Sequence, residues 1–115
     1  MTEKFQVQFL EEAVEFLDKL DEKARGKVIY NIQKARLSND KELFKKLKNE
    51  IWEFRTLFNR TYYRLFAFWD KTGQTETIVI STHGLIKKTD KTPSGELEKA
   101  ERNRKLYFER KNNER

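Results

Sequence analysis

The chain of 115 residues contains no cysteine, one histidine and one methionine. Without cysteine it has neither disulfides nor thiolate metal ligands, and one histidine cannot build the clusters typical of metal sites. No apolar run approaches the roughly 20 residues of a membrane span, and the N-terminus lacks the apolar segment of a signal peptide. The sequence therefore predicts a cytoplasmic protein that has no membrane segment and needs neither a metal nor another cofactor.

Proline and glycine are scarce as well, at one and four residues. No glycine-rich phosphate loop, metal motif or nucleophile elbow is present, so nucleotide hydrolysis and metal catalysis are not expected. Charged residues make up 38% of the chain and the mean hydropathy is -0.94. Nine phenylalanines and two tryptophans nevertheless supply a core, which argues against disorder. The length predicts one domain over residues 1–115.

Positive charge is abundant and unevenly distributed. The net charge is +6, and residues 41–115 contain 18 basic and 11 acidic side chains, whereas residues 1–40 contain 7 and 8. A basic surface on one part of a protein favours a polyanionic partner, which can be a nucleic acid or an acidic protein.

The first forty residues predict a strand followed by two helices. Phe5, Val7 and Phe9 alternate with polar residues, as in a half-buried strand. Apolar residues then recur at helical spacing over residues 10–20, and again after Asp21, which is expected to cap a second helix over residues 22–35. Residues 38–40 predict a break, and the apolar residues of segment 43–47 predict a short helical turn.

Extended segments follow, at residues 52–57, 62–69 and 78–83. Asn59 and Arg60 predict one turn, and residues 70–73 predict another. Pro93 fits the first turn of a last helix with Thr92 as its cap, and residues 110–115 are expected to fray. The fold class is therefore α+β: a mainly antiparallel four-stranded sheet with two N-terminal helices on one face and a C-terminal helix.

Alternation along the strands divides the side chains between the two faces of this sheet. If the apolar positions of each strand meet the N-terminal helices, then Arg55, Arg64, Ser81 and His83 share the opposite face. Phe66 and Phe68 lie on that face too and need cover from the last helix.

This arrangement supplies candidates for phosphodiester chemistry. Guanidinium groups match phosphate oxygens, so Arg55 and Arg64 could clamp a phosphate; the alternative is that they pair with Glu53 or another carboxylate. His83 could transfer a proton, or simply bond to backbone at a strand end. Lys87 and Lys88 could stabilise charge on a phosphorane, or be merely solvated.

Further residues could extend a track for nucleic acid. Basic side chains would contact backbone phosphates, and an exposed aromatic ring could stack on a base. The candidate RNA-binding residues are Lys45, Lys46, Lys48, Arg60, Tyr62 and Lys91.

The chain resembles the RelE/ParE superfamily of bacterial toxins, in particular its HigB-like, phage Gp49-like branch. The resemblance rests on three segments, which span nearly the whole chain together with a helix containing Glu96, Ala100 and Arg104. They are Leu47-Lys48 before Ile51-Trp52-Glu53-Phe54-Arg55, then Tyr63-Arg64-Leu65-Phe66, then residues 83–93 from His83-Gly84 to Thr92-Pro93.

This resemblance implies a type II toxin that cuts mRNA in the ribosomal A site without a metal, through attack of the 2′-hydroxyl. Arg55, Arg64, Lys87 and Lys88 match the basic positions of the family. RelE itself uses a tyrosine near its end, for which this chain has no clear equivalent, so His83 is assigned the proton transfer. The implied partners are a helix-turn-helix, HigA-like antitoxin, the ribosome and mRNA. The alternatives are a ParE-like inhibitor of DNA gyrase and a non-catalytic, phage-derived nucleic-acid-binding protein.

Overall fold

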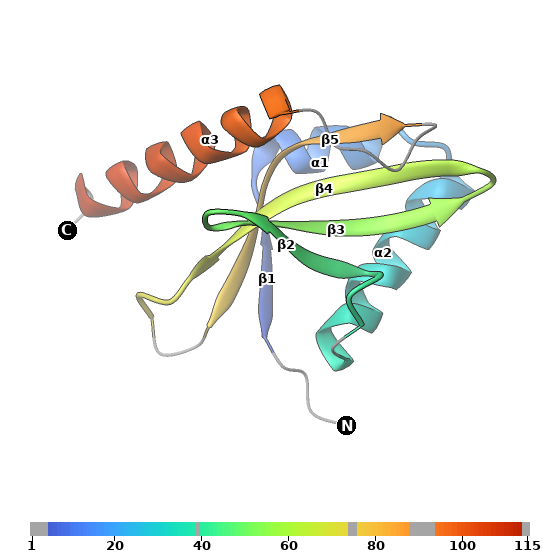
Figure 1. Ribbon diagram of the computed structural model, residues 1–115, viewed down its shortest axis with the longest axis horizontal. Coiled ribbons are helices and arrows are strands. Elements are labelled where there is room, and N and C mark those ends of the chain that lie inside the picture. Colours follow the sequence, from blue (N-terminus) through green and yellow to red (C-terminus); the bar gives the residue numbers. More distant parts are fainter. Residues whose placement is uncertain (1–4, 39, 74–75, 88–93, 114–115) are drawn as a thin grey trace.

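A computed structural model describes residues 5–38, 40–73, 76–87 and 94–113 of the chain (Figure 1). At residues 78–84, 87 and 94 the description covers the backbone alone. The strands form one sheet in the order β1-β5-β4-β3-β2, in which β1 is parallel to β5 and all other neighbours are antiparallel. The strand bounds are β1 Gln6–Phe9, β2 Phe44–Lys48, β3 Ile51–Phe58, β4 Thr61–Asp70 and β5 Thr77–Lys87.

Two helices, α1 (Glu11–Asp18) and α2 (Glu22–Leu37), pack on one face of the sheet. The long C-terminal helix α3 (Ser94–Asn113) packs on the other face (Figure 1). Helix α2 begins where predicted, because the Asp21 carboxylate accepts a hydrogen bond from the backbone N–H of Ala24 at 2.9 Å. The predicted α+β class and the placement of the helices are confirmed.

The larger core lies between the sheet and the two N-terminal helices. Its centre is built from one stripe of each helix and from the alternating apolar positions of the strands. The buried members are Phe5, Ala13, Leu17, Leu20, Ala24, Val28, Ile32, Ala35, Phe54, Leu65 and Ala67.

A smaller core lies between the opposite face of the sheet and α3. Ile51, Phe66, Phe68 and Ala100 are fully buried there. Phe68 makes ring contacts with Tyr107 and Phe108 of α3, at centroid distances of 5.2 and 5.8 Å. The expectation that the last helix covers Phe66 and Phe68 is confirmed.

The β3–β4 hairpin closes through the predicted turn at Asn59 and Arg60. Phe58 pairs with Thr61, so these two residues alone form the connection. Both have positive φ, 52° and 62°, as a type I′ hairpin turn requires. Arginine has a Cβ and adopts this backbone less readily than glycine does.

Two predictions about local structure are wrong. Segment 43–47, expected to be a helical turn, supplies edge strand β2, so the sheet has one strand more than expected. The Phe44 ring stacks on Phe54 and Trp52 of this sheet, at 4.3 and 4.7 Å. The expected frayed tail is also partly helical, since α3 continues to Asn113. The expected cap Thr92 and the first-turn Pro93 lie outside the described residues.

Candidate functional site

Arg55 and Arg64 occupy directly opposed positions on β3 and β4, and Leu85 of β5 lies opposite Arg64. Opposed residues of neighbouring strands point to the same face of a sheet. The predicted common face of the two arginines is therefore confirmed, and it is the face that α3 partly covers.

Glu53 joins the two guanidinium groups. Its carboxylate lies 3.2 Å from Nε of Arg55 and 3.5 Å from Nη1 of Arg64. The Glu53 and Arg64 side chains are only 1% and 2% exposed, whereas Arg55 is 20% exposed. The pairing with Glu53, which was the alternative to phosphate binding, is thus present. The single negative charge of Glu53 balances only one of the two positive charges of the arginines.

A shallow cavity of about 350 Å³ opens beside this cluster. Its wall combines β2 and the arginine cluster with one residue of α3. The lining residues are Lys45, Lys46, Leu47, Lys48, Glu53, Arg55, Arg64 and Leu97. Three lysines and two arginines against one carboxylate make the cavity electropositive, which suits an anion such as a phosphate.

The three predicted RNA-binding lysines of segment 45–48 are thus at the cavity, on an edge strand rather than a helix. All three are exposed. Lysines on an edge strand also discourage pairing with the strands of other molecules, so their presence has a structural reason as well as a functional one.

Tyr62 and Arg60 lie toward the β3–β4 turn and are not among the residues lining the cavity. The guanidinium of Arg64 is 5.4 Å from the centre of the Tyr62 ring, within the range of a cation–π interaction. Arg60 is exposed at the tip of the hairpin.

The other predicted residues belong to β5 or to the segment after it. His83 lies where the register of β5 against β4 shifts, between the pairs Ala67–Ile80 and Leu65–Gly84, and Lys87 lies opposite Tyr62. For both residues the description stops at the backbone. Lys88 and Lys91 lie outside the described residues.

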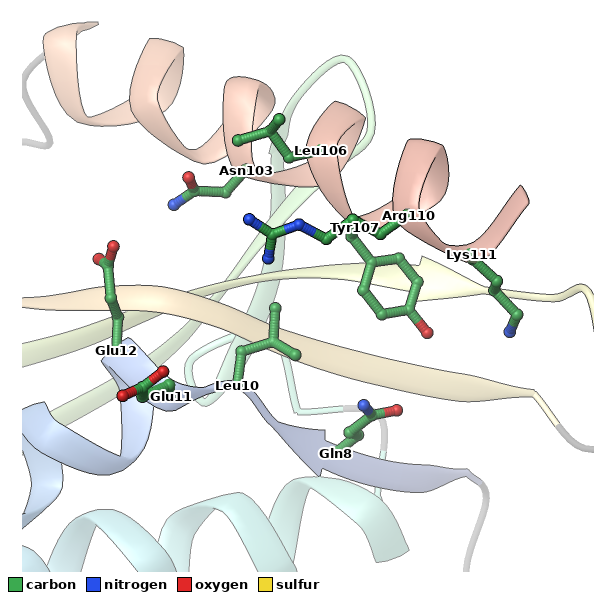
Figure 2. A pocket seen from close by; sticks show the side chains of 9 residues that line it. All are labelled: Gln8, Leu10, Glu11, Glu12, Asn103, Leu106, Tyr107, Arg110 and Lys111. Carbon is green, nitrogen blue, oxygen red and sulfur yellow. The ribbon is translucent and has the colours of Figure 1, made fainter. Parts of the chain in front are cut away.

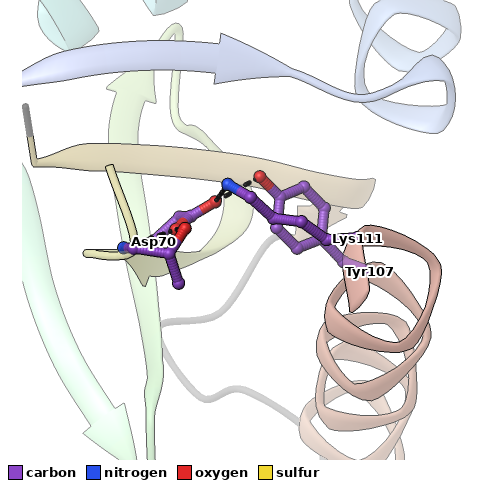
Figure 3. A network of polar contacts seen from close by, with 4 residues as sticks. Asp70, Tyr107 and Lys111 are labelled. Atoms are coloured by element: carbon purple, nitrogen blue, oxygen red, sulfur yellow. Dashed lines mark hydrogen bonds and ion pairs between the residues drawn. The ribbon is translucent and has the colours of Figure 1, made fainter. Parts of the chain in front are cut away.

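One partly buried polar network was not anticipated from the sequence. Asp70, at the end of β4, accepts hydrogen bonds from Tyr107 at 2.5 Å and from Lys111 at 2.6 Å, both in α3 (Figure 3). The backbone N–H and hydroxyl of Thr72 donate to its other oxygen. Burial raises the pKa of Asp70, but the bonds from Lys111, Thr72 and Tyr107 outweigh burial and hold the pKa well below its ordinary value. The network clamps the last turns of α3 onto the sheet.

A second, larger cavity of about 670 Å³ lies between α3 and the junction of β1 with α1 (Figure 2). Glu11 and Glu12 line one side, and Arg110 and Lys111 line the other. Opposite charges on facing walls do not define the sign of a ligand, so the electropositive cavity at Arg55 is the stronger candidate for binding RNA.

Metal ligands do not gather in the described parts of the chain. No group of three or more histidine, aspartate or glutamate side chains there is placed to hold a metal ion. Of the helices in those same parts, none is long and apolar enough to cross a membrane.

Residues 15–105 match the family described as phage derived protein Gp49-like (DUF891). The chain belongs to this family. The Gp49-like family is a RelE/HigB-like toxin family and is associated with toxin–antitoxin systems. The matched region runs from α1 into α3 and includes the strands that hold Arg55 and Arg64. Comparisons with curated proteins and with solved structures gave no match.

Proposed function

We propose that this Gp49-like protein is the toxin of a type II toxin–antitoxin pair and that it cleaves mRNA on the ribosome. The observation that supports the proposal most directly is the opposed pair Arg55 and Arg64, joined by Glu53 at the edge of an electropositive cavity. A phosphodiester in this cavity would have a guanidinium and several ammonium groups within reach. The reaction needs neither a metal nor a cofactor.

In the proposed reaction the 2′-hydroxyl of the RNA attacks the adjacent phosphorus. The new bond joins phosphorus to the 2′-oxygen, and the bond from phosphorus to the 5′-oxygen of the next nucleotide breaks. The attacking hydroxyl loses a proton and the leaving oxygen gains one. His83 is the proposed group for these transfers, with Lys87 and Lys88 stabilising the charge that develops on the phosphorane.

The burial of the two arginines assigns them different parts in this proposal. Arg55 reaches the surface and would contact phosphate oxygens directly. Arg64 is almost fully buried, so it acts as a positioning residue: it holds Glu53, which in turn orients Arg55. Lys45, Lys46 and Lys48 would bind neighbouring phosphates, while Arg60, Tyr62 and Lys91 would extend the contact along the strand.

Two partners follow from this function. A HigA-like antitoxin with a helix-turn-helix domain would neutralise the toxin, and the ribosome would present the mRNA and complete the geometry of the site. The net charge of +6 favours fast association with ribosomal RNA.

The test is to induce the protein in bacteria and to map the 5′ ends of the mRNA. Growth arrest with cuts in phase with codons is expected. Intact transcripts together with altered DNA supercoiling would instead identify a gyrase inhibitor and contradict the proposal.

Arg55→Ala should lower cleavage by about 100-fold or more, as expected when one charged contact to a developing oxyanion is lost. Lys71→Ala is the matched control, because it removes one exposed positive charge that pairs weakly with Glu76 at 4.0 Å, outside the cavity. Equal cleavage by both folded variants would reject the assignment of Arg55.

A further inference from the structure

Helix α2 has a second apolar stripe on the side that faces away from the sheet. Its members recur at intervals of three and four residues, which places them on one face of a helix. They are Gly26, Ile29, Tyr30 and Leu37, with the polar Gln33 among them, and all five are exposed. Ile29, Tyr30 and Leu37 are 40%, 60% and 38% exposed. The residues that α2 buries in the core, such as Val28 and Ile32, lie on the opposite face.

Gly26, at the N-terminal end of this stripe, has no role that the fold explains. A glycine inside a helix destabilises it relative to alanine. Its φ is not positive, and a Cβ at this position would meet no atom within 4 Å. Neither backbone conformation nor internal packing therefore requires glycine here, whereas a partner lying close against the helix would.

Lysines border the stripe on one side. Lys23, Lys27 and Lys34 are exposed, and Nζ of Lys27 lies 5.3 Å from the centre of the Tyr30 ring. Glu22 is the one acidic residue in the sequence of α2. The two arginines of α2 lie on the other side and donate to backbone carbonyls: Arg25 to Leu20 at 3.2 Å and Arg36 to Phe5 at 3.0 Å. Arg36 also donates to the side-chain oxygen of Gln33 at 2.8 Å.

We propose that this face of α2 is the docking surface for an acidic amphipathic helix of a partner protein. The apolar side chains of that helix would pack along Ile29, Tyr30 and Leu37, with closest approach at Gly26. Its carboxylates would lie against the bordering lysines.

The charge and the apolar character of the face decide between possible occupants. A second copy of the chain would add further lysines to the same interface, where like charges repel. A nucleic-acid backbone would satisfy the lysines but would leave the apolar side chains in the centre of the stripe without a partner. An acidic helix satisfies both.

The docking surface and the Arg55 cavity lie on opposite sides of the sheet, since α2 packs on one face and the cavity opens on the other. A partner on α2 would therefore leave the cavity open. This inference does not depend on RNA cleavage, and the two can fail separately.

The probe for the test is a synthetic helical peptide with leucines at every third and fourth position and glutamates on their flanks. A peptide of equal composition with scattered leucines, and one with lysines in place of glutamates, are the controls. Fluorescence anisotropy gives the affinities, and amide chemical shifts of the labelled protein locate the binding surface. The first peptide should bind about tenfold or more tightly than either control, with shift changes centred on α2.

Gly26→Leu should weaken this binding by about tenfold or more, because the added side chain holds the peptide away from the helix. The variant should fold and melt at the same or a higher temperature, since leucine is a better helix former than glycine. Gly95→Leu is the matched control: Gly95 is also a helical glycine with no atom within 4 Å of a Cβ, and this variant should bind as the parent does. The double variant Lys27→Glu, Lys34→Glu should weaken binding without touching the core.

Equal binding of the three peptides, or full binding by Gly26→Leu, would overturn the proposal. So would self-association of the protein through α2, or tighter binding of α2 to an RNA duplex or to anionic vesicles than to the acidic peptide. Cleavage of mRNA is measured in parallel. If the parent protein does not cleave mRNA, the proposed function is contradicted, whereas the docking proposal still stands on the peptide-binding results.

Discussion

Among single residues, Glu53 links the fold to the proposed chemistry. It is buried with Arg64 and reaches Arg55 at the cavity edge. Buried ion pairs often contribute little to stability by themselves, but removing one partner leaves a charge without compensation in a region of low dielectric constant. Glu53 is therefore expected to matter for stability and for the orientation of Arg55 alike.

Replacing Glu53 with glutamine tests this expectation. Glu53→Gln keeps the shape but removes the charge, and it should lower the free energy of unfolding by about 3 kcal/mol. Urea denaturation measures the loss. Adding Arg64→Met should restore part of it, because the buried cation that faces Glu53 is removed as well. A double variant that is less stable than Glu53→Gln would contradict the ion-pair interpretation.

The sequence predicted that Arg55 and Arg64 share a face, because alternation in paired strands leaves no other choice once the apolar face is identified. It did not predict that Glu53 and Arg64 would be buried. Their burial depends on how far α3 extends over the sheet, which no local pattern encodes. The assignment of His83 to the same face stays a prediction, since alternation cannot be carried across a change of register such as the one beside it.

Among the elements, helix α3 depends on polar contacts as well as on its small core. The Asp70 carboxylate accepts hydrogen bonds from Tyr107 and Lys111, which lie in the last turns of α3. Apolar residues are sparse near the C-terminus, which is why the sequence predicted a frayed tail there. The residue that anchors these turns is Asp70, which precedes Tyr107 by 37 residues and so belongs to no local pattern. The strand β2 was missed for a similar reason: its apolar spacing fits a helix, and the aromatic rings that favour a strand belong to β3.

The pH dependence of stability should reveal the Asp70 network. The pKa of Asp70 in the folded protein lies below its ordinary value of 3.8, so the unfolded chain takes up the proton first. The stabilisation is therefore complete above about pH 5 and is lost as the pH falls through and below the ordinary value.

Asp70→Asn should be less stable than the parent by about 2 kcal/mol near pH 7, with a difference that shrinks as the pH approaches about 2. Thermal unfolding over this pH range measures it. The exposed residue Asp18 provides the control, since Asp18→Asn should unfold like the parent at each pH. A constant difference between Asp70→Asn and the parent would show that the charge of Asp70 is not what stabilises α3.

The β3–β4 turn offers a test in which stability and binding move in opposite directions. Arg60 has a φ of 62°, so Arg60→Gly should raise the free energy of unfolding by about 0.5 to 1 kcal/mol. If Arg60 contacts RNA as proposed, the same variant should bind RNA more weakly. Denaturation and RNA-binding titrations separate the two effects, and a more stable variant with unchanged RNA affinity would remove Arg60 from the proposed RNA contacts.

For the whole molecule, the two faces of the sheet divide the proposed roles. One face bears the electropositive cavity beside α3, and the other bears the helix pair whose outer side is the proposed docking surface. The uneven charge of the sequence predicted a polyanionic partner in general terms. It could not locate the cavity, because residues from β2, β3, β4 and α3 meet there only in the folded chain.

Salt should weaken the binding of RNA in proportion to the number of phosphates contacted. A plot of log affinity against log salt concentration for a 2′-deoxy oligonucleotide, which cannot be cleaved through a 2′-hydroxyl, should fall by about 0.7 per contact. Arg55→Ala should reduce the slope by about that amount, whereas Lys71→Ala should leave it unchanged. Identical slopes for the parent and Arg55→Ala would mean that Arg55 does not touch a phosphate.

The parallel pairing of β1 with β5 has a consequence for biosynthesis. Gln6 lies opposite Thr77, and Phe9 opposite Ile80, so the first strand has no neighbour until β5 has left the exit tunnel. The β3–β4 hairpin, by contrast, joins segments close in sequence and can form much earlier. A nascent molecule can therefore bring its arginine pair together before β1 finds its place beside β5.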